Sequence, residues 1–310
     1  MMEKPYYQMS YPLQFLLMVL LAIGGLIIGG LICGIIIVII YGVSGFSNIM
    51  QLSADMPASA LNSLKFMQMG SSVFGFLIPA IFFAKVIVRQ PKTYLKANWR
   101  FPLVLLLVVF FIMLIASPMM EMLINLNQKM VLPQALKGLE RWMRNMEDTA
   151  GEQTEILLKM KSPLSFLVNL LMIAILPAVA EEFLFRGCFQ QIFIGWTKSI
   201  HWGVWLSAAL FSAIHFQFFG FLPRMLLGVF FGYFAAWSGS IWPGVLGHFL
   251  NNGTALIVSY LYQLKKIKVN PDEQQMFDWK SYAFSILLTL ILFLVYKKVS
   301  QTYNQRLQTV

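Results

Sequence analysis

Two adjacent glutamates, Glu181 and Glu182, stand inside a long apolar run of this 310-residue chain, followed one turn later by Arg186. Apart from Glu121 at the end of another apolar run, the remaining acidic residues fall in polar loops or tails. A carboxylate deep in a membrane costs on the order of 3 kcal/mol on insertion scales, and more in simulations. Two carboxylates beside one arginine therefore require a partner, a water-filled cavity or a chemical role.

The spacing of these charges separates the two glutamates on a helix. Glu182 and Arg186 lie one turn apart, so they share a face and can pair. Glu181 points about 100° away from Glu182 and is left to face a cavity. Pro177, four residues before Glu181, opens the helix near the site. The alternative is a structural ion pair that holds two helices together. We favour a functional site, because ionisable residues inside spans usually mark one.

Three histidines follow the glutamates in the sequence: His201, His215 and His248. His201 stands beside Lys198 at an expected membrane boundary, where it needs no special role. His248 is followed one turn later by Asn252 on the same helical face. Each histidine alone is more often a satisfied buried residue than a catalyst. Together with a glutamate pair on a neighbouring span, His215, His248 and Asn252 indicate a candidate site.

Groups of these types support the activation of water. A carboxylate acts as a general base, and a neutral imidazole orients water, binds a metal or stabilises an oxyanion. Glu181, His215 and His248 would also satisfy a catalytic Zn²⁺ site with one position left for water. Neither histidine lies in the H-E-x-x-H helix of the usual zinc metalloprotease. The residues therefore leave a metal-free and a zinc-dependent reaction open.

Other intramembrane hydrolases fit the chain less well. An aspartyl protease needs two aspartates within spans, and all four aspartates lie outside the apolar runs: Asp55, Asp148, Asp272 and Asp278. A serine protease is open, because Ser238 and Ser240 precede His248. That scheme leaves Glu181 and Glu182 without a role.

The composition identifies the class of protein that must position these residues. Hydrophobic residues make up 58% and charged residues 12% of the chain, against roughly 25% charged residues in soluble domains. This is typical of a polytopic membrane protein. The net charge of +10 is concentrated in short loops beside the apolar runs, where cytoplasmic retention of Lys and Arg explains it without a nucleic-acid partner. The two cysteines, Cys33 and Cys188, provide neither a disulfide framework nor a zinc cluster.

A membrane span needs about 20 apolar residues, which predicts an all-α bundle of about eight transmembrane helices. The expected spans lie near residues 13–41, 64–88, 101–122, 164–195, 203–218, 222–238, 241–262 and 281–297. Residues 1–160 form an N-terminal region, 161–262 a core that holds the candidate site, and 263–310 a loop, the last span and a basic tail. Within the polar interval 123–163, apolar residues at helical spacing predict an amphipathic helix on the membrane surface.

Three short patterns, in this order, resemble the motifs of a known family. They are Glu181-Glu182-x-x-x-Arg186, Phe211-x-x-x-His215 and His248-x-x-x-Asn252. They resemble the CPBP family, which groups type II CAAX prenyl endopeptidases with bacteriocin-processing and Abi-like membrane proteins. Each pattern alone is loose, but three in order on separate spans are specific. The resemblance covers about residues 165–260.

The resemblance implies an α-helical intramembrane protease with its site inside the bundle. By residue-wise transfer, Glu181 activates the water with the help of His215. His248 and Asn252 hold the oxyanion or complete a metal site, with Asn251 as a neighbouring alternative to Asn252. Glu182 and Arg186 support the geometry or the substrate. These are the roles that the motifs imply.

We therefore expect an endopeptidase that hydrolyses a peptide bond of a membrane-associated or exported substrate, CAAX-like or bacteriocin-type, in the bacterial inner membrane. The expected partners are membrane lipid and a peptide or protein substrate, and Zn²⁺ is the candidate cofactor. Two other classes remain. One is a non-catalytic immunity or scaffold protein with the family's fold. The other is a transporter that uses the buried Glu/Arg site, which would predict internal repeats and a second broken helix. Neither feature is clear in the sequence.

Overall fold

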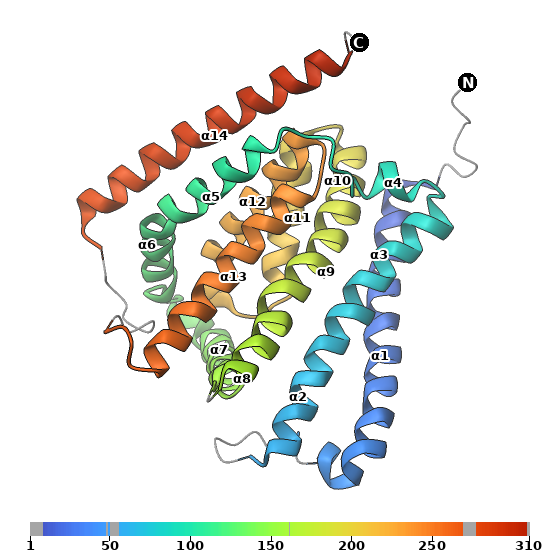
Figure 1. The fold of residues 1–310 in the computed structure, drawn as a ribbon, viewed down its shortest axis with the longest axis vertical. Coiled ribbons are helices and arrows are strands. Elements are labelled where there is room, and N and C mark those ends of the chain that lie inside the picture. The colour runs from blue at the N-terminus through green and yellow to red at the C-terminus, as the bar shows by residue number, and fades with distance from the viewer. Residues whose placement is uncertain (1–8, 48, 50–55, 161, 269–276, 309–310) are drawn as a thin grey trace.

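The computed structural model describes residues 9–47, 49, 56–160, 162–268 and 277–308, and in these residues it contains helices and no strands (Figure 1). The all-α fold expected from composition is confirmed. The helices of the N-terminal half are α1 (Tyr11–Ser47), α2 (Ala58–Gly70), α3 (Ile78–Phe82), α4 (Pro91–Tyr94), α5 (Val104–Ile115), α6 (Ser117–Gln128) and α7 (Lys137–Leu158). Those of the second half are α8 (Pro163–Asn169), α9 (Leu176–Leu184), α10 (Gln190–Thr197), α11 (Ile200–Ala213), α12 (Phe221–Ser238), α13 (Trp242–Gln263) and α14 (Trp279–Gln308).

Five helices of the described chain are long and apolar enough to cross a membrane, and the α5–α6 pair makes six if it is counted as one bent span. The five are Tyr11–Ser47, Ala58–Ile87, Pro163–Thr197, Phe218–Ser238 and Trp279–Arg306. All eight segments expected from the sequence are helical. Two of these eight segments are not among the five long helices or the bent pair: α11, which is short, and α13. Both pack against neighbouring helices of the bundle.

The bend between α5 and α6 has a local cause. The two helices meet at 46°, where Pro118 occupies the start of α6. Proline has no N–H to donate to the carbonyl of Leu114 four residues earlier. The hydroxyl of Ser117 donates to that carbonyl instead, at 2.6 Å. The break therefore leaves no unsatisfied carbonyl at Leu114 and redirects the span.

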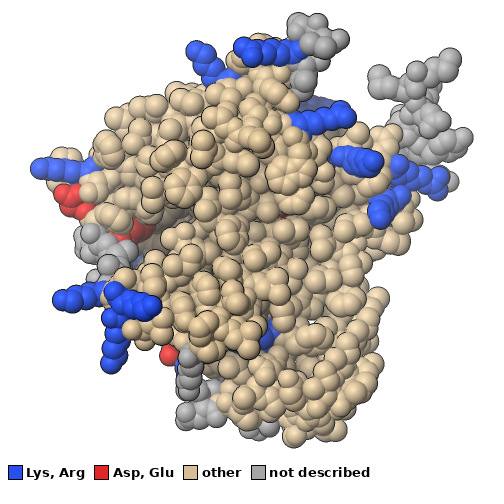
Figure 2. Space-filling view, viewed as in Figure 1, with Lys and Arg blue, Asp and Glu red and all other residues tan. Residues whose placement is uncertain are grey.

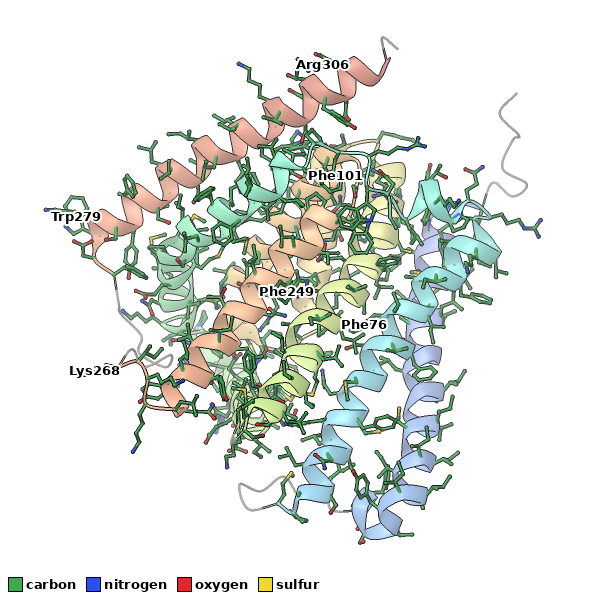
Figure 3. All side chains as sticks on the ribbon, viewed as in Figure 1. Phe76, Phe101, Phe249, Lys268, Trp279 and Arg306 are labelled. Carbon is green, nitrogen blue, oxygen red and sulfur yellow. The ribbon has the colours of Figure 1, made fainter. Side chains whose placement is uncertain are left out.

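Helices α9 to α13 form the centre of the molecule, with the hairpin of α1 and α2–α3 on one side and α14 on the other (Figure 1). Trp279 and Arg306 lie near the two ends of α14 (Figure 3), and apolar side chains between them, such as Leu290, are exposed. Tyr296 anchors α14 by donating its hydroxyl to the carbonyl of Phe234 in α12, at 2.9 Å. Lys and Arg gather at the periphery of the face in Figure 2 and leave a broad uncharged surface between them, as a lipid-facing wall requires.

The amphipathic helix expected in the polar interval is α7. Its exposed apolar side chains include Leu139, Trp142 and Met146, which share one face. Near its start, Glu140 accepts hydrogen bonds from Lys137 at 2.8 Å and from Arg144. The Lys137 ammonium, with the other donors around it, lowers the pKa of Glu140 to about 2. This charged cluster fixes the first turns of α7 while its apolar face stays exposed.

Candidate active site

The two glutamates lie in a long helix that is interrupted twice. Residues 163–197 run through α8, a π-helical stretch, α9, a second π-helical stretch and α10. The π-helical stretches are Leu170–Ile175 and Phe185–Phe189. Glu181 and Glu182 therefore occupy a short α-helical segment between two wider turns, and Arg186 lies in the second of these turns. Such π-helical turns are rare and frequently occur at functional sites.

Glu182 and Arg186 form the buried ion pair that their spacing predicts. The Nη1 atom of Arg186 lies 2.8 Å from Oε1 of Glu182, and the two side chains are 1% and 0% exposed. Nη2 of Arg186 donates to the carbonyl of Gly228 in α12, at 2.8 Å. The guanidinium also lies over the rings of Phe211 and Phe231, 4.9 and 5.4 Å from their centroids. Breaking a pair this deeply buried leaves one charge without compensation.

His248 connects both glutamates to α13. Its Nδ1 lies 3.2 Å from Oε1 of Glu182 and its Nε2 lies 3.8 Å from Oε2 of Glu181. The imidazole is stacked on Phe231 with 5.1 Å between ring centroids, and Phe211 meets it edge-on at 5.8 Å. These contacts hold the ring in one plane between the two carboxylates. The structure thus brings the first and third sequence motifs into direct contact.

His215 lies next to this cluster, in contact with Phe211. Its ring is 5.2 Å from that of Phe211, which also contacts His248. Nδ1 of His215 lies 2.8 Å from the carbonyl oxygen of Phe211. That partner requires Nδ1 to carry the proton, so Nε2 is the basic nitrogen. Within the described residues, no hydrogen bond joins His215 to Glu181 or Glu182. The second motif is therefore adjacent to the glutamates without touching them.

Asn252 uses its amide to bridge two helices. Its Nδ2 donates to the carbonyl of Ile173 at 3.0 Å, and its Oδ1 accepts from Nδ2 of Asn251 at 3.0 Å. Ile173 lies four residues before Pro177, which has no N–H to give to that carbonyl. Asn252 supplies the missing donor from α13. The amide thereby holds α13 against the opened helix just before the glutamates. Its role as an oxyanion donor stays a prediction.

Replacing Asn252 by alanine is expected to destabilise the fold by about 1 kcal/mol, because the Ile173 carbonyl loses a donor in a partly buried setting. Pro177→Ala restores an N–H at the position that can reach the same carbonyl. The double variant should therefore lose less than the two single effects combined. Denaturant unfolding in detergent measures this double-mutant cycle. Pro177→Ala combined with Asn127→Ala, at a distant site, is the additive control, and additivity for Asn252 and Pro177 would contradict the shared carbonyl.

The loop after His215 is held in place by α6 and α7. Nδ2 of Asn127 donates to the carbonyl of Phe218 at 3.0 Å, and its Oδ1 accepts from the N–H of Leu222 at 2.7 Å. Glu147 of α7 accepts from the N–H of Phe219 at 3.1 Å. The segment between His215 and α12 is thus clamped from two helices. This clamp fixes the position at which the second motif enters the site.

Several residues that shape the site are not marked by the motifs. Gly244 packs so closely on Glu182 that a Cβ there would lie 2.8 Å from Oε2 of the carboxylate. Gly228 supplies the carbonyl that binds Arg186. Arg224 of α12 donates to Oε1 of Gln217 at 2.6 Å, in the loop that follows His215. A second arginine inside an apolar span was the sequence signal for Arg224. No sequence signal marked Gly228 or Gly244 as part of the site.

The candidate metal ligands do not form a metal-binding set. Across the described parts of the chain, no group of three or more His, Cys, Asp or Glu side chains is placed to hold a metal ion. Glu181 and His248 are neighbours, and the side-chain hydrogen bond and the ring contact of His215 are with Phe211. The placed side chains thus do not fit the expected Zn²⁺ site, and metal dependence stays a prediction.

The two serines before His248 have structural roles. Ser238 donates its hydroxyl to the carbonyl of Phe234, and Ser240 donates its hydroxyl to the carbonyl of Asn98. Both hydroxyls thus cap backbone groups around the turn between α12 and α13. Their bonds do not favour a serine nucleophile.

Comparison with known families finds a match that covers the candidate site. Residues 163–254 match the Rce1-like family, described as type II CAAX prenyl endopeptidase Rce1-like. The matched range contains all three motifs, from Glu181 to Asn252. The resemblance drawn from the motifs is therefore confirmed over these residues. Together with the apolar helices, this match indicates an integral membrane protein in which residues 163–254 are similar to a type II CAAX prenyl endopeptidase.

One curated protein is similar to part of the chain. The chain is 26% identical over 110 residues to the "Uncharacterized protein YpbD" of Bacillus subtilis (strain 168). The alignment covers 34% of this chain and spans about half (51%) of that protein. No solved structure matches the chain significantly. The family match therefore carries the functional comparison.

Proposed function

We propose that the protein is an intramembrane endopeptidase in which Glu181 activates the attacking water. One observation carries this proposal: His248 lies between the two buried glutamates, and among the described residues Arg186 forms its ion pair with Glu182 and not with Glu181. The pair with Arg186 keeps Glu182 as a structural carboxylate. In the described part of the chain, the ion-pair contact of Glu181 is the one with the imidazole of His248, at 3.8 Å. An acid in this position is suited to exchange a proton during the reaction.

The proposed reaction follows from these positions. Glu181 takes a proton from water, and the hydroxide attacks the carbonyl carbon of the scissile peptide bond. The proton then passes from Glu181 to the leaving nitrogen as the C–N bond breaks. A neutral imidazole at His215 orients the water or the developing oxyanion. His248, held by Glu182, keeps the Glu181 carboxylate in place. No step is assigned to a metal.

The proposed substrate is a membrane-associated or exported peptide, either CAAX-like or of the bacteriocin type. The match to a type II CAAX prenyl endopeptidase family supports the first of these. Glu181 and Glu182 lie in Pro163–Thr197, a helix of membrane-spanning length, so the scissile bond must be presented at the bilayer. We place the protein in the bacterial inner membrane, in contact with lipid and with its peptide substrate.

A cleavage assay in liposomes tests the proposal. Prenylated CAAX tails and double-glycine leader peptides serve as substrates for the wild type and for His215→Gln. Loss of an oxyanion or water-orienting group at His215 should lower kcat by about 10²-fold or more. His201→Gln is the matched control, because His201 is exposed and bonds Tyr233. A chelator arm tests zinc dependence. Undiminished cleavage by His215→Gln, or no cleavage by the wild type, would count against the proposal and favour a scaffold or transporter.

A further inference from the structure

One basic residue of the helices that build the site has no part in the proposed reaction. The chain from α8 to α13 contains three Lys or Arg residues: Arg186, Lys198 and Arg224. Arg186 is paired with Glu182, and the ammonium of Lys198, at the end of α10, lies 4.9 Å from the centre of the Tyr11 ring. Arg224 lies in α12, within a segment of membrane-spanning length. A cation in such a segment is costly and usually marks a functional group.

Arg224 lies on the side of α12 that contacts the candidate active site. Gly228, four residues later, supplies the carbonyl that accepts from Arg186, and Phe231, seven residues later, stacks on His248. Residues at these spacings share one face of a helix. Arg224 is therefore on this face, about 6 Å along the helix axis from Gly228.

The side chain of Arg224 extends toward the loop that follows His215. Nη2 donates to Oε1 of Gln217 at 2.6 Å, and Nη1 lies 3.5 Å from the carbonyl oxygen of the same residue. A Cβ on Gly220 would lie 3.3 Å from Nη2, so a glycine there leaves room for the guanidinium. Phe216, directly after His215, has a left-handed φ of 53°, and residues with such strained backbones cluster at functional sites. The guanidinium therefore lies beside the second motif.

The guanidinium keeps a charge and N–H groups that the described chain does not satisfy. Arginine has five N–H donors, and the partner of Arg224 is Gln217, which is neutral. Among the described residues, no carboxylate lies within ion-pair distance of Arg224. Glu147, which holds the same loop, accepts from the N–H of Phe219. In this part of the chain no nitrogen of Arg224 is enclosed without a partner, so the remaining N–H groups are open to a ligand.

The geometry of a guanidinium selects its ligand. Its planar fork of N–H groups matches the two oxygens of a carboxylate, and such charge-assisted hydrogen bonds are about twice as strong as neutral ones. A peptide carbonyl also accepts, but it leaves the charge of Arg224 uncompensated at membrane depth. In a peptide substrate, a carboxylate is found at the C-terminus or on the side chain of Asp or Glu. A carboxylate is therefore the substrate group that Arg224 fits best.

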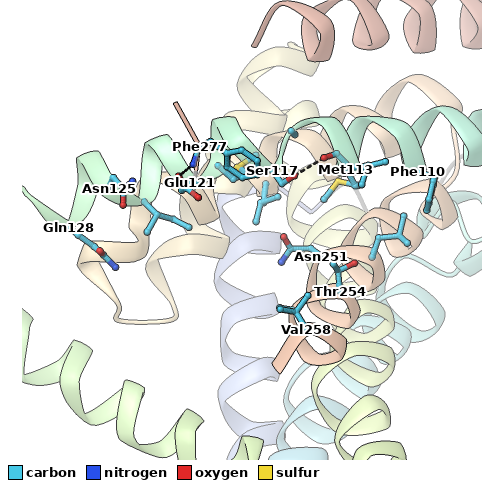
Figure 4. A pocket seen from close by; sticks show the side chains of 17 residues that line it. Phe110, Met113, Ser117, Glu121, Asn125, Gln128, Asn251, Thr254, Val258 and Phe277 are labelled. Atoms are coloured by element: carbon cyan, nitrogen blue, oxygen red, sulfur yellow. Dashed lines mark hydrogen bonds between the residues drawn. The ribbon is translucent and has the colours of Figure 1, made fainter. Parts of the chain in front are cut away.

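A large pocket beside α13 does not offer the same chemistry. It measures about 600 Å³ and lies between α13 and the bend from α5 to α6, with Met113 and Ser117 on one side and Asn251 and Thr254 on the other (Figure 4). Helix α12 contributes Leu227 to its lining, and none of the described residues that line it is Lys or Arg. The cation that favours a carboxylate is therefore at Arg224 and not in this pocket.

We propose that Arg224 determines substrate specificity by binding a carboxylate of the peptide, at its C-terminus or on an acidic side chain. This role deepens the proposed function and, for its effect on cleavage, rests on it. Glu181 and His215 act on the scissile bond, and Arg224 holds the carboxylate beside them. Residues of an extended peptide are spaced by about 3.4 Å. A fixed arginine therefore fixes how many residues separate the cleaved bond from the carboxylate.

Fluorescence anisotropy of labelled peptides, titrated with the full chain in a non-ionic detergent, measures this binding. The probe is one prenylated CAAX tail with an uncharged last residue, in three forms: the free acid, its amide, and an amide whose last residue is replaced by Glu. All proteins carry Glu181→Gln so that the peptides stay intact. We expect the Kd of a form with a carboxylate to be at least tenfold lower than that of the plain amide. Arg224→Gln should abolish this difference, and Arg224→Lys should keep part of it.

The comparison among the three forms separates recognition from folding. A misfolded variant binds all forms more weakly, whereas the loss of Arg224 weakens only the forms that carry a carboxylate. Arg141→Gln, which removes a positive charge from an exposed position of α7, is the matched control and should bind as the parent does. Preference for the free acid assigns the C-terminus, and preference for the Glu form assigns a side chain. Either result supports the proposal if Arg224→Gln abolishes it.

Three results would overturn the proposal. Equal binding of all three forms by the parent would show that no carboxylate is recognised. A preference that survives in Arg224→Gln would mean that another group holds the carboxylate. Absence of binding by any form would remove the peptide site. Because binding is measured without cleavage, a preference that depends on Arg224, together with no cleavage by the wild type, would refute the protease and leave the carboxylate site.

Discussion

Replacing Glu181 by glutamine is expected to lower kcat/KM for peptide cleavage by about 10²–10⁴-fold, the usual contribution of a general base. Glutamine keeps the size of the side chain and can still contact His248, but it cannot accept a proton from water. The liposome cleavage assay, with initial rates measured over a range of substrate concentrations, gives the change in kcat and KM separately. Loss in kcat with little change in KM is the expected pattern.

The matched control for this experiment is Glu152→Gln on α7, where the side chain is exposed. It should cleave as the wild type does. Unfolding of the Glu181→Gln variant must also match that of the wild type, because a folding defect alone would reduce activity. A correctly folded Glu181→Gln variant that retains cleavage would remove Glu181 from the chemistry.

The largest expected effect on stability comes from Arg186→Ala, at about 3–5 kcal/mol. Arg186 is buried between Glu182 and the carbonyl of Gly228, at 2.8 Å from each. Its removal leaves the carboxylate of Glu182 without its cation in a low-dielectric interior. Denaturant unfolding in detergent, followed by tryptophan fluorescence, measures the change in the free energy of unfolding.

A double variant distinguishes two contributions to this destabilisation: the loss of the contacts of Arg186 and the uncompensated charge that remains on Glu182. Glu182→Gln with Arg186→Met removes both charges, and the Gln oxygen can still accept from Nδ1 of His248. Its stability should recover a large part of the loss, since neutralising both members of a buried pair is often tolerated. Lys137→Ala breaks a partly exposed pair with Glu140 and should cost no more than about 1 kcal/mol. An Arg186→Ala variant as stable as Lys137→Ala would contradict this account.

The helices could be predicted from the sequence because each depends on the composition and periodicity of its own segment. Runs of about 20 apolar residues predicted the membrane spans. The helical spacing of Leu139, Trp142 and Met146 predicted α7. The π-helical stretches on either side of the glutamates were not predicted. A π-helical turn contains one extra residue, and in a run made only of apolar residues this does not change the hydrophobic pattern. The bend after Ile115 was also missed, although Pro118 was its signal.

The site was predicted in part for the same reason. The ion pair of Glu182 and Arg186 depends on the spacing of two residues within one helix, so the local sequence could predict it. The structure contains this pair. The contact of His248 with both glutamates joins residues 66 positions apart. It depends on how α13 packs against α9, which no local pattern encodes. The hydrogen bond from Asn252 to the carbonyl of Ile173 likewise depends on tertiary packing. The sequence could show only that Pro177 lacks the N–H that such a carbonyl would otherwise accept from.

The buried cluster also constrains how the protein is made. The helix of Glu181, Glu182 and Arg186 enters the membrane during synthesis before the rest of the core exists. The carbonyl of Gly228 lies 42 residues after Arg186, and His248 lies 66 residues after Glu182. At the time of insertion the only partner that Glu182 has is Arg186, one turn away. That spacing lets the nascent helix cross into lipid as a partly neutralised unit. Glu181 gains its neighbour only when α13 arrives, so assembly of the site is among the last steps of biogenesis.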